Sequence, residues 1–396
     1  MLIIEVVLLV YFGFVSLYSF LLSFAGLFFR TPNPPDSAIK RKIAVLIPSY
    51  KEDNVIVEVA EEALKQQYPS DRFDVVIIAD SLQPATLEKL RQLPIKLVEV
   101  VFDKSTKVKS LNKAMEVIGD DYEFALILDA DNVMEPQFLN KLNNMLGLGY
   151  RAIQGERTSK NQTTSMSVLD GFSERINNYI YRQGHAAVGL SAALIGSGMI
   201  FEYGLLKRLL GTLNSVGGFD RALEYLLVRE GVRIYYGKGA IVYDEKVETT
   251  EVFEMQRTRW LSSQFVYLRE YFWEGVAALF KGRFGMFNSA ILKNIQLPRL
   301  INLGLLFIFT VVSIIFREYL TLSFYPWLVL FLLSVLSIAL AIPLRFYNWQ
   351  MVKSALLLPK VFIKMFNLLF KLKGANKTFI HTPHGVSNAA GSKKSD

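Results

Sequence analysis

Three long apolar segments constrain the fold of this chain more than any other feature of the sequence. They run over Leu2–Phe29, Leu300–Phe316 and Tyr325–Leu344, and a helix needs about 20 apolar residues to cross the hydrocarbon core of a membrane. Hydrophobic residues make up 52% of the chain, more than the roughly 45 to 50% that is usual for soluble domains. The sequence therefore predicts an integral membrane protein with about three transmembrane helices.

The flanks of these segments predict their orientation. No basic residue precedes the first segment and no Ala-x-Ala cleavage site follows it, which favours an uncleaved anchor over a signal peptide. Basic residues follow the first segment, precede the second and follow the third, whereas the loop Arg317–Phe324 is poor in them. Because cytoplasmic flanks are enriched in Lys and Arg, we expect an inner or plasma membrane protein. Its N-terminus would lie outside, and its central domain and C-terminal tail in the cytoplasm.

Charge and cysteine content exclude several classes of function. The 44 Lys and Arg residues exceed the 36 Asp and Glu residues by 8, and their position near the apolar segments favours contact with anionic membrane lipids over nucleic-acid binding. The absence of cysteine excludes disulfides, thiolate zinc sites and thiol nucleophiles. Three histidines give little material for a histidine-built metal site.

Between the first and second apolar segments the sequence predicts an α/β domain. Residues 31–42 form a proline-rich linker. Strand-length apolar runs then alternate with helical patterns, which indicates a mainly parallel sheet with helices on both faces. The runs are Ile43–Ile47, Val75–Ile78, Lys96–Val101 and Phe124–Leu128, and the helical patterns include Val55–Gln67 and Ser110–Ile118. No Gly-x-Gly-x-x-Gly follows the first run, so the chain is unlike a Rossmann dehydrogenase.

Two further segments are predicted to lie on the membrane surface. Lysines 353, 360, 364 and 371 share one helical face over Gln350–Lys373, with apolar residues opposite and a kink expected at Pro359. The aromatic-rich segment Trp260–Phe287 is interpreted in the same way. The tail 391–396 is expected to be disordered.

Polar residues gather where the predicted strands end, which is where parallel sheets bind ligands. Asp129 and Asp131 close the fourth apolar run, and two carboxylates one residue apart can hold a hard divalent cation while substrate phosphates complete its shell. Asp80 ends the second run and could bind a nucleobase or ribose. Lys107 and Lys109 could meet phosphate. Each motif alone is weak, and a solvated turn or surface residue is an alternative for each.

Two later motifs suit the acceptor side of a transfer reaction. The small residues Gly196-Ser197-Gly198 would permit close approach of a sugar, or form a plain turn. Asp220 is the candidate for removing a proton from an attacking hydroxyl. An alternative role for Asp220 is to cap a helix over Arg221–Glu230, and Glu224 is the reserve candidate.

Taken in order, these motifs resemble the family 2 glycosyltransferases of the cellulose, chitin and hyaluronan synthase group over about Ile43–Trp260. The resemblance implies a GT-A-type domain, in which a Pro-x-Tyr-x-Glu motif, a strand-end aspartate, a Lys-x-x-x-Leu-Asn motif and Asp-x-Asp bind nucleotide sugar and metal. The matching residues are Pro48, Tyr50, Glu52, Asp80, Lys107, Leu111, Asn112, Asp129 and Asp131. It also implies an acceptor-side turn at Gly196, Ser197 and Gly198.

The resemblance extends to the catalytic base and to a Gln-x-x-Arg-Trp motif. The base of the family stands eleven residues before a glycine that precedes an aromatic strand, which here leads from Gly231 to Asp220. The two residues before it are Gly218 and Phe219 where the family has Thr and Glu, and Ala222 replaces a common acidic residue. The final motif is present as Gln256, Arg259 and Trp260. Arg suits a diphosphate and Trp suits the face of a sugar ring.

The predicted organisation follows from these assignments. Its parts are an anchor at 1–30, a linker at 31–42, a cytosolic GT-A domain at 43–255, interfacial helices at 256–298, two transmembrane helices at 299–345, an amphipathic helix and tail at 346–390 and a disordered end at 391–396. The predicted function is an inverting hexosyltransferase that uses Mg²⁺ or Mn²⁺ and transfers sugar from a nucleotide diphosphate sugar, UDP-sugar first, to a growing polysaccharide.

Several alternatives stay open at the level of sequence. Three spans are few for a polymer channel, because every polar group of a path through lipid must be satisfied by protein. A homo-oligomer or an export partner could complete a channel, or the product could be a short oligosaccharide or a lipid-linked sugar. A non-enzymatic alternative is an inactive scaffold that binds nucleotide sugar, supported by the altered motif before Asp220.

Overall fold

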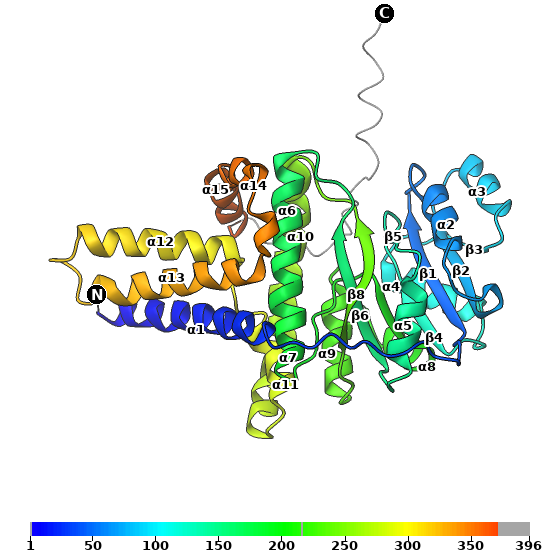
Figure 1. Cartoon of the computed structure of the whole chain (residues 1–396), viewed down its shortest axis with the longest axis horizontal. Helices are drawn as coiled ribbons and strands as arrows, with labels where there is room; N and C mark the ends of the chain where they lie inside the picture. Colours follow the sequence, from blue (N-terminus) through cyan, green and yellow to red (C-terminus); the bar gives the residue numbers. More distant parts are fainter. Residues whose placement is uncertain (1, 215–216, 371–396) are drawn as a thin grey trace, which may run out of the picture.

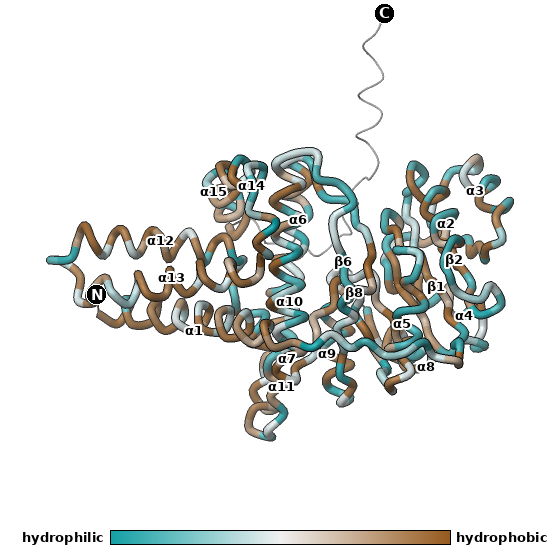
Figure 2. Tube along the Cα trace, in the orientation of Figure 1, coloured by the Kyte–Doolittle hydropathy of each residue, from teal (hydrophilic) through white to brown (hydrophobic). Residues whose placement is uncertain are grey.

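The computed structural model describes residues 2–214 and 217–370 of the chain. Figure 1 shows an α/β layer at one end and three long apolar helices at the other, with α6 (Ser165–Asn177) and α10 (Thr250–Phe280) standing between them. Figure 2 shows that the most hydrophobic tube lies in the three-helix part. The predicted separation of a polar domain from an apolar one is therefore present in space.

One eight-stranded sheet forms the α/β layer, in the order β3-β2-β1-β4-β7-β6-β8-β5. The strands are β1 (Ile43–Tyr50), β2 (Phe73–Asp80), β3 (Lys96–Val100), β4 (Phe124–Ile127), β5 (Val133–Met134), β6 (Ala152–Ser159), β7 (Met199–Glu202) and β8 (Tyr235–Asp244). The pairs β1–β2, β2–β3, β1–β4 and β6–β8 are parallel, whereas β4–β7, β6–β7 and β5–β8 are antiparallel. Four of these seven pairs are parallel, so the sheet is mainly parallel, as predicted, and the antiparallel pairs are those of β5 and β7.

Helices cover both faces of this sheet. Along β1, Ile43, Val45 and Ile47 face a core shared with α2, α3 and α5. Ala44 and Leu46 face the opposite core, shared with α4, α8 and α9. A strand that is apolar at every position is expected where both faces are buried. The helices are α2 (Ile56–Leu64), α3 (Pro84–Arg91), α4 (Lys107–Val117), α5 (Phe138–Leu146), α8 (Tyr203–Gly211) and α9 (Phe219–Arg229), with the short helix η1 (Ser70–Arg72) before β2.

The first two strands are longer than the sequence predicts. β1 continues to Tyr50 and β2 to Asp80, paired residue for residue over Ile43–Tyr50. Helix α4 begins at Lys107, because the side chain of Thr106 caps it by accepting from the backbone N–H of Lys109. Asp80 and Lys107 are therefore held by regular structure and not by loops.

The apolar part consists of α1 (Leu2–Gly26), α12 (Arg299–Ile315) and α13 (Phe324–Ala341). By length and composition, α1 and α13 are long enough to cross a membrane, and α12 is a shorter apolar helix. Hydroxyl pairs join α1 to α13, Ser16 with Ser334 and Ser23 with Ser337, each at 2.9 Å. Small polar residues of this kind are frequent where helices pack in lipid.

The segments predicted to lie on the membrane surface differ in detail from the prediction. Gln256–Trp260 lies inside the continuous helix α10, so the predicted boundary at 255/256 does not coincide with an end of a helix. The predicted helix over 350–373 is two helices, α14 (Trp349–Ala355) and α15 (Leu358–Leu368). Pro359 stands in the first turn of α15, where a missing N–H breaks no hydrogen bond, so the chain starts a new helix instead of kinking one.

The remaining short elements connect these parts. They are the π-helix η2 (Asn178–Gly184) and α7 (His185–Ala187) after α6, α11 (Phe284–Phe287) and the π-helix η3 (Asn288–Leu292) after α10, and η4 (Leu344–Phe346) after α13. Lys371 and the predicted disordered end lie outside the described residues.

Candidate active site

A cavity of about 690 Å³ lies at the carboxyl ends of β1, β2 and β4 and extends toward the apolar helices. It brings together most of the predicted site residues. They are Pro48, Tyr50, Glu52, Asp80, Lys107, Asp129, Asp131, Gly196, Asp220, Gln256, Arg259 and Trp260. These residues come from positions 48 to 260, and only the fold makes them neighbours.

Asp129 and Asp131 follow β4 at the floor of the cavity. The ammonium of Lys107 pairs with Asp129 Oδ1 and also donates to the carbonyl of Gly196 at 2.8 Å. The Asp129 side chain is 37% exposed, whereas Asp131 is 5% exposed. Asn132 Nδ2 orients Asp131 by donating to its Oδ1 at 3.1 Å. Both carboxylates line the cavity, and that of Asp129 is the more exposed of the two.

This pair fits a hard divalent cation that takes part of its shell from a substrate. Within residues 2–214 and 217–370, no group of three or more His, Cys, Asp or Glu side chains is arranged to hold a metal ion. Two carboxylates supply oxygen ligands, and phosphate oxygens and waters can complete the octahedron that Mg²⁺ requires. The site therefore suits a metal that arrives with a phosphorylated substrate.

The turn Gly196–Gly198 supports this floor from behind. Ser197 Oγ accepts from the backbone N–H of Asp129 at 3.0 Å and donates to Asn132 Oδ1. Ser197 is completely buried, and of the three residues only Gly196 lines the cavity. The Ser197 hydroxyl thus turns inward and holds the Asp129 loop, and acceptor contacts of Ser197 and Gly198 stay a prediction.

Asn112 is likewise absent from the cavity wall. Its Nδ2 donates to the carbonyl of Leu210 at 3.1 Å and so ties α4 to α8. In α4, Lys107 and Asn112 are five residues apart, which separates their side chains around the helix. Asn112 thus joins two helices in this structure, and its contact with a nucleotide sugar stays a prediction.

Asp220 is the second residue of α9, on the opposite side of the cavity from β1. The helix is capped by Gly218, in a left-handed conformation with φ of 65°, so the alternative role of Asp220 as N-cap is wrong. A Cβ at Gly218 would lie 2.7 Å from Cβ of Ser263 in α10. Glycine here lets α9 lie against α10 and brings Asp220 close to the Gln256–Trp260 segment.

Electrostatics distinguish Asp220 from the reserve candidate Glu224. Burial raises the pKa of Asp220, against opposing effects of Arg221 and Lys107. Burial would also raise the pKa of Glu224, but Lys293 and hydrogen bonds from Ser289 and the backbone of Leu194 hold that pKa below its ordinary value. Glu224 is thus a structural anion between α9 and η3.

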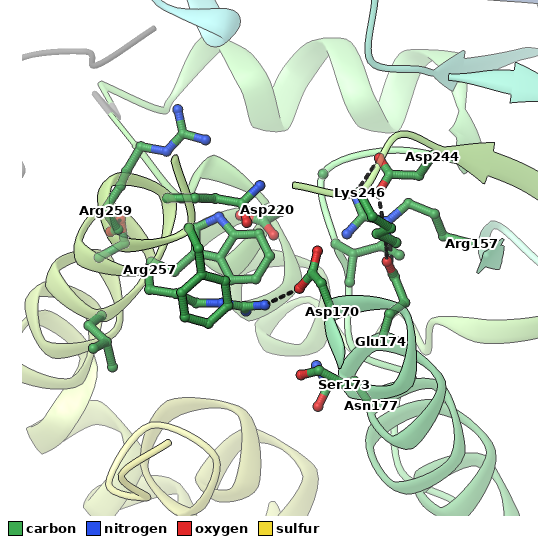
Figure 3. A pocket seen from close by; sticks show the side chains of 18 of the residues that line it. Arg157, Asp170, Ser173, Glu174, Asn177, Asp220, Asp244, Lys246, Arg257 and Arg259 are labelled. Atoms are coloured by element: carbon green, nitrogen blue, oxygen red, sulfur yellow. Dashed lines mark hydrogen bonds and ion pairs between the residues drawn. The ribbon is translucent and has the colours of Figure 1, made fainter. Parts of the chain in front are cut away.

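The Gln256–Trp260 segment faces the cavity from α10 (Figure 3). Burial lowers the pKa of Arg259, while Asp129 and Asp220 act on it in the opposite direction, so Arg259 lies between the two acidic sides of the site. Arg257 lies over the Trp260 ring at 4.3 Å and pairs with Asp170 of α6. Gln256 Oε1 is buried without a hydrogen-bond partner.

The sequence of this chain matches a model of a known protein family. The model described as "Glycosyltransferase like family 2" matches residues 40–263, more than half of the chain. The chain belongs to this glycosyltransferase family. The match ends just past Trp260, so it covers the sheet and the motif residues and leaves α12–α15 outside.

Individual relatives of this glycosyltransferase are distant. The Bacillus subtilis (strain 168) protein named "Probable glycosyltransferase YdaM" is 22% identical over 247 residues, 58% of this chain and 56% of that protein. The chain thus aligns with only about half the length of that curated relative.

Solved structures show the fold. The mannosyltransferase PcManGT from Pyrobaculum calidifontis, in complex with GDP-Man and Mn²⁺, superposes with a TM-score of 0.56 at 17% identity, over 92% of this chain and 95% of that one. Glucosyl-3-phosphoglycerate synthase from Mycobacterium tuberculosis, with Mn²⁺, UDP and glucosyl-3-phosphoglycerate, gives a TM-score of 0.38 at 14% identity, over 56% and 78%. The superposition with PcManGT, together with the family match, shows a mixed α/β, GT-A-like fold.

Sequence reasoning missed a buried ionic cluster in the wall of the glycosyltransferase cavity. Arg157 Nε contacts Glu174 Oε1 at 2.8 Å and its Nη1 lies 3.5 Å from Asp244, while Lys246 pairs with both carboxylates. Figure 3 shows Arg157, Glu174, Asp244 and Lys246 gathered in this cluster. Asn132 joins the cluster to the Asp129–Asp131 segment by donating to Asp244 at 2.9 Å. The position of Asp244 at the end of β8 could have identified it, but nothing in the sequence pairs Arg157 with Glu174.

Proposed function

We propose that this glycosyltransferase transfers a sugar, with inversion, from a nucleotide diphosphate sugar to a hydroxyl acceptor at a membrane surface. A single observation carries the proposal: one cavity is lined both by Asp129, Asp131 and Lys107 and by Asp220 and Trp260. The first set suits a diphosphate and its metal. The second suits an acceptor sugar.

On the donor side, Tyr50, Glu52 and Asp80 stand at the strand ends where a nucleoside would lie. A bound Mg²⁺ or Mn²⁺ would be held by Asp129 and Asp131 and would neutralise charge on the leaving diphosphate. Arg259 would bind that diphosphate. The structures with bound UDP or GDP-Man support a nucleotide sugar as donor, and a UDP-sugar stays our first choice.

On the acceptor side, Asp220 acts as the base. It accepts the proton of the attacking hydroxyl as that oxygen bonds to the anomeric carbon, while the bond from this carbon to the diphosphate breaks. Attack from the face opposite the leaving group inverts the configuration. A pKa raised by burial suits Asp220 to this role, because a base works best when its pKa lies closer to the operating pH.

The test compares Asp220→Asn with the wild type. We expect transfer to fall by about 10² to 10⁴-fold, the range for loss of a general base, while nucleoside diphosphate binding is retained. Asp71→Asn is the matched control, because that side chain is 76% exposed and distant from the cavity wall. Full transfer by Asp220→Asn would remove this mechanism.

The membrane setting is part of the proposal. We propose that α1, α12 and α13 span the membrane, with the N-terminus outside and the sheet domain in the cytoplasm, because basic residues flank the cytoplasmic ends. The apolar surfaces of α1 and α13 support it. The acceptor would be a growing polysaccharide, a short oligosaccharide or a lipid-linked sugar.

The inactive scaffold remains the competing proposal. Release of free nucleoside diphosphate from candidate donor sugars in the presence of Mn²⁺ would eliminate it. A protein that binds these donors and never releases diphosphate, with any acceptor offered, would favour it over our proposal.

A further inference from the structure

The cavity has a second half that the transfer reaction does not use. Beyond Trp260 it continues between α6 and the helices α12 to α15, and its walls there are apolar. We call this half the apolar branch; its walls include Leu169 and Phe172 of α6, Leu303 of α12, Ile338 of α13, Ala355 of α14 and Val361 of α15. A glycan would place hydroxyls against these walls at a cost in free energy. A hydrocarbon chain would not.

Two arginines stand where the apolar branch meets the polar half. Arg299 begins α12 and donates to Asn177 of α6. The described residues offer Arg299 no carboxylate within ion-pair distance. Arg257 lies close enough for the two guanidinium groups to repel each other. Arg257 pairs with Asp170, yet its Nε is buried without a hydrogen-bond partner.

The charge at this junction is therefore positive and incompletely compensated. Of the two guanidinium groups, that of Arg257 pairs with the carboxylate of Asp170, whereas that of Arg299 donates to the amide oxygen of Asn177. The amino end of α12 adds to the positive potential, since Pro298 precedes it and no side chain caps it. A buried cation without a counter-charge is costly, and an anionic ligand would remove that cost. Phosphate is the anion that arginines bind bidentately.

The order of charged, aromatic and apolar side chains along the cavity indicates the order of chemical groups in the ligand. Asp220, on the acceptor side, and Arg259 lie within electrostatic reach of the donor-side residues Lys107 and Asp129. The Trp260 ring comes next, with Arg257 at 4.3 Å from its centre. Arg299 follows, and Leu303, one turn along α12, begins the apolar branch. Figure 3 shows Asp170, Ser173 and Asn177 on one face of α6; Asp170 is the partner of Arg257 and Asn177 that of Arg299.

We propose that the apolar branch binds the hydrocarbon chain of a lipid-phosphate-linked sugar acceptor, whose phosphate contacts Arg299 and Arg257 and whose sugar hydroxyl reaches Asp220. This inference rests on the proposed function and selects one of its acceptors. The acceptor hydroxyl gives its proton to Asp220 and its oxygen bonds to the anomeric carbon of the donor. The electron pair of the broken bond leaves with the nucleoside diphosphate, so the lipid-linked glycan gains one sugar.

The first experiment maps the ligand without requiring turnover. Purified full-length protein in detergent is irradiated with a benzophenone-bearing farnesyl phosphate, and labelled peptides are identified by mass spectrometry. We expect label in the peptides of α6, α12, α14 and α15. Farnesyl phosphate should compete about tenfold more strongly than farnesol, which lacks the charge, and inorganic phosphate should not compete.

Two outcomes of this experiment would overturn the proposal. One is label spread over the outward faces of α1 and α13 and absent from the apolar branch. The other is equal competition by a two-chain phospholipid such as phosphatidylglycerol, which would make the branch a place for ordinary membrane lipid.

Two matched variants distinguish a loss of labelling caused by a filled apolar branch from a loss caused by a damaged fold. Ala355→Phe fills the branch, whereas Val352→Phe adds the same ring on the same helix at a side chain that is 49% exposed. We expect Ala355→Phe to lower labelling about tenfold and Val352→Phe to leave it unchanged, with UDP or GDP binding equal in both. Arg299→Gln should abolish the advantage of farnesyl phosphate over farnesol, and Arg299→Lys should restore part of it.

Photolabelling tests the lipid site, whereas release of nucleoside diphosphate tests the proposed function. If Ala355→Phe and Val352→Phe label equally, the lipid site is wrong even where diphosphate release shows an active transferase. If the wild type labels as expected but releases no nucleoside diphosphate from any donor, the proposed function fails while the lipid site stands.

Discussion

Single residues around the cavity act either on substrate or on one another, and burial separates the two groups. Asp129 is partly exposed to the cavity, whereas Ser197 is completely buried behind it. Glu224 has a lowered pKa and several donors, so it anchors α9. Asp220 has a raised pKa in the same helix. Chemistry at this site therefore depends on which carboxylates the fold leaves uncompensated.

Ser197 should matter for stability and for metal binding. Ser197→Ala removes the acceptor of the Asp129 N–H and the donor to Asn132. Unsatisfied buried polar groups cost about 1–3 kcal/mol each, so we expect a loss of that size in the free energy of unfolding, measured by denaturant titration. Mn²⁺-dependent nucleotide binding should weaken as well. Ser70→Ala, at an exposed position, should change neither quantity; equal behaviour of the two variants would contradict this role.

Arg221 should set the acid limb of the pH profile. The deprotonated form of Asp220 is the active base, so kcat/KM should fall as pH drops through its pKa. Arg221 opposes the rise that burial causes in the pKa of Asp220. Arg221→Gln should therefore raise that pKa and move the acid limb to higher pH. Arg229→Gln, farther along α9 and 45% exposed, serves as control. A limb that moves downward or stays in place in Arg221→Gln would exclude Asp220 as the titrating base.

At the scale of elements, the contact of α9 with α10 places base and acceptor platform together. The contact depends on Gly218, which combines a positive φ with close approach to Ser263. Glu224 and Lys293 join α9 to the segment after η3 in addition. The spacing of Gly217-Gly218-Phe219-Asp220 is thus a packing requirement of two helices that are distant in sequence.

Replacing Gly218 tests this contact. Gly218→Ala forces a left-handed backbone on a residue with a side chain and brings its Cβ against Ser263, so we expect a loss of about 1–3 kcal/mol in stability and a lower kcat. Gly211→Ala is the control, since no atom lies within 4 Å of its added Cβ. A thermal melt and a transfer assay measure both effects. An unchanged kcat in Gly218→Ala would separate the helix contact from catalysis.

The whole molecule joins a polar sheet domain to a set of apolar helices through α6 and α10 (Figure 1). Its cavity crosses that join, with a polar half in the sheet domain and the apolar branch among the helices. A soluble sugar would need only the first half. The second half therefore supports a reaction at a membrane.

Orientation is the prediction that belongs to this scale. We expect a fluorescent protein fused to the C-terminus to fluoresce in the cytoplasm, and alkaline phosphatase fused to the N-terminus to be active outside, because basic flanks favour the cytoplasmic side. The protein should remain with the membrane after an alkaline carbonate wash. Both ends on one side, or release by carbonate, would contradict the proposed topology of three spans.

The sequence determined the features that depend on local pattern. Apolar run lengths predicted β1 to β4 and the apolar helices, and polar residues after those runs located Tyr50, Asp80, Asp129 and Asp131 at one edge of a sheet. These predictions succeed because strand ends and helix faces depend on the pattern of residues that are consecutive in sequence. Asp220 and Gln256 to Trp260 were found by their order relative to those motifs.

Only the tertiary structure decided the features that join distant segments. It inserted β7 antiparallel between β4 and β6, turned Asn112 toward α8 and Ser197 toward the backbone of Asp129, and closed the ion pairs of Arg157 and Lys246. It also formed the apolar branch from α6 and helices up to two hundred residues later in the chain. Strand direction, charge pairing and cavity shape depend on packing between segments, which no local pattern encodes.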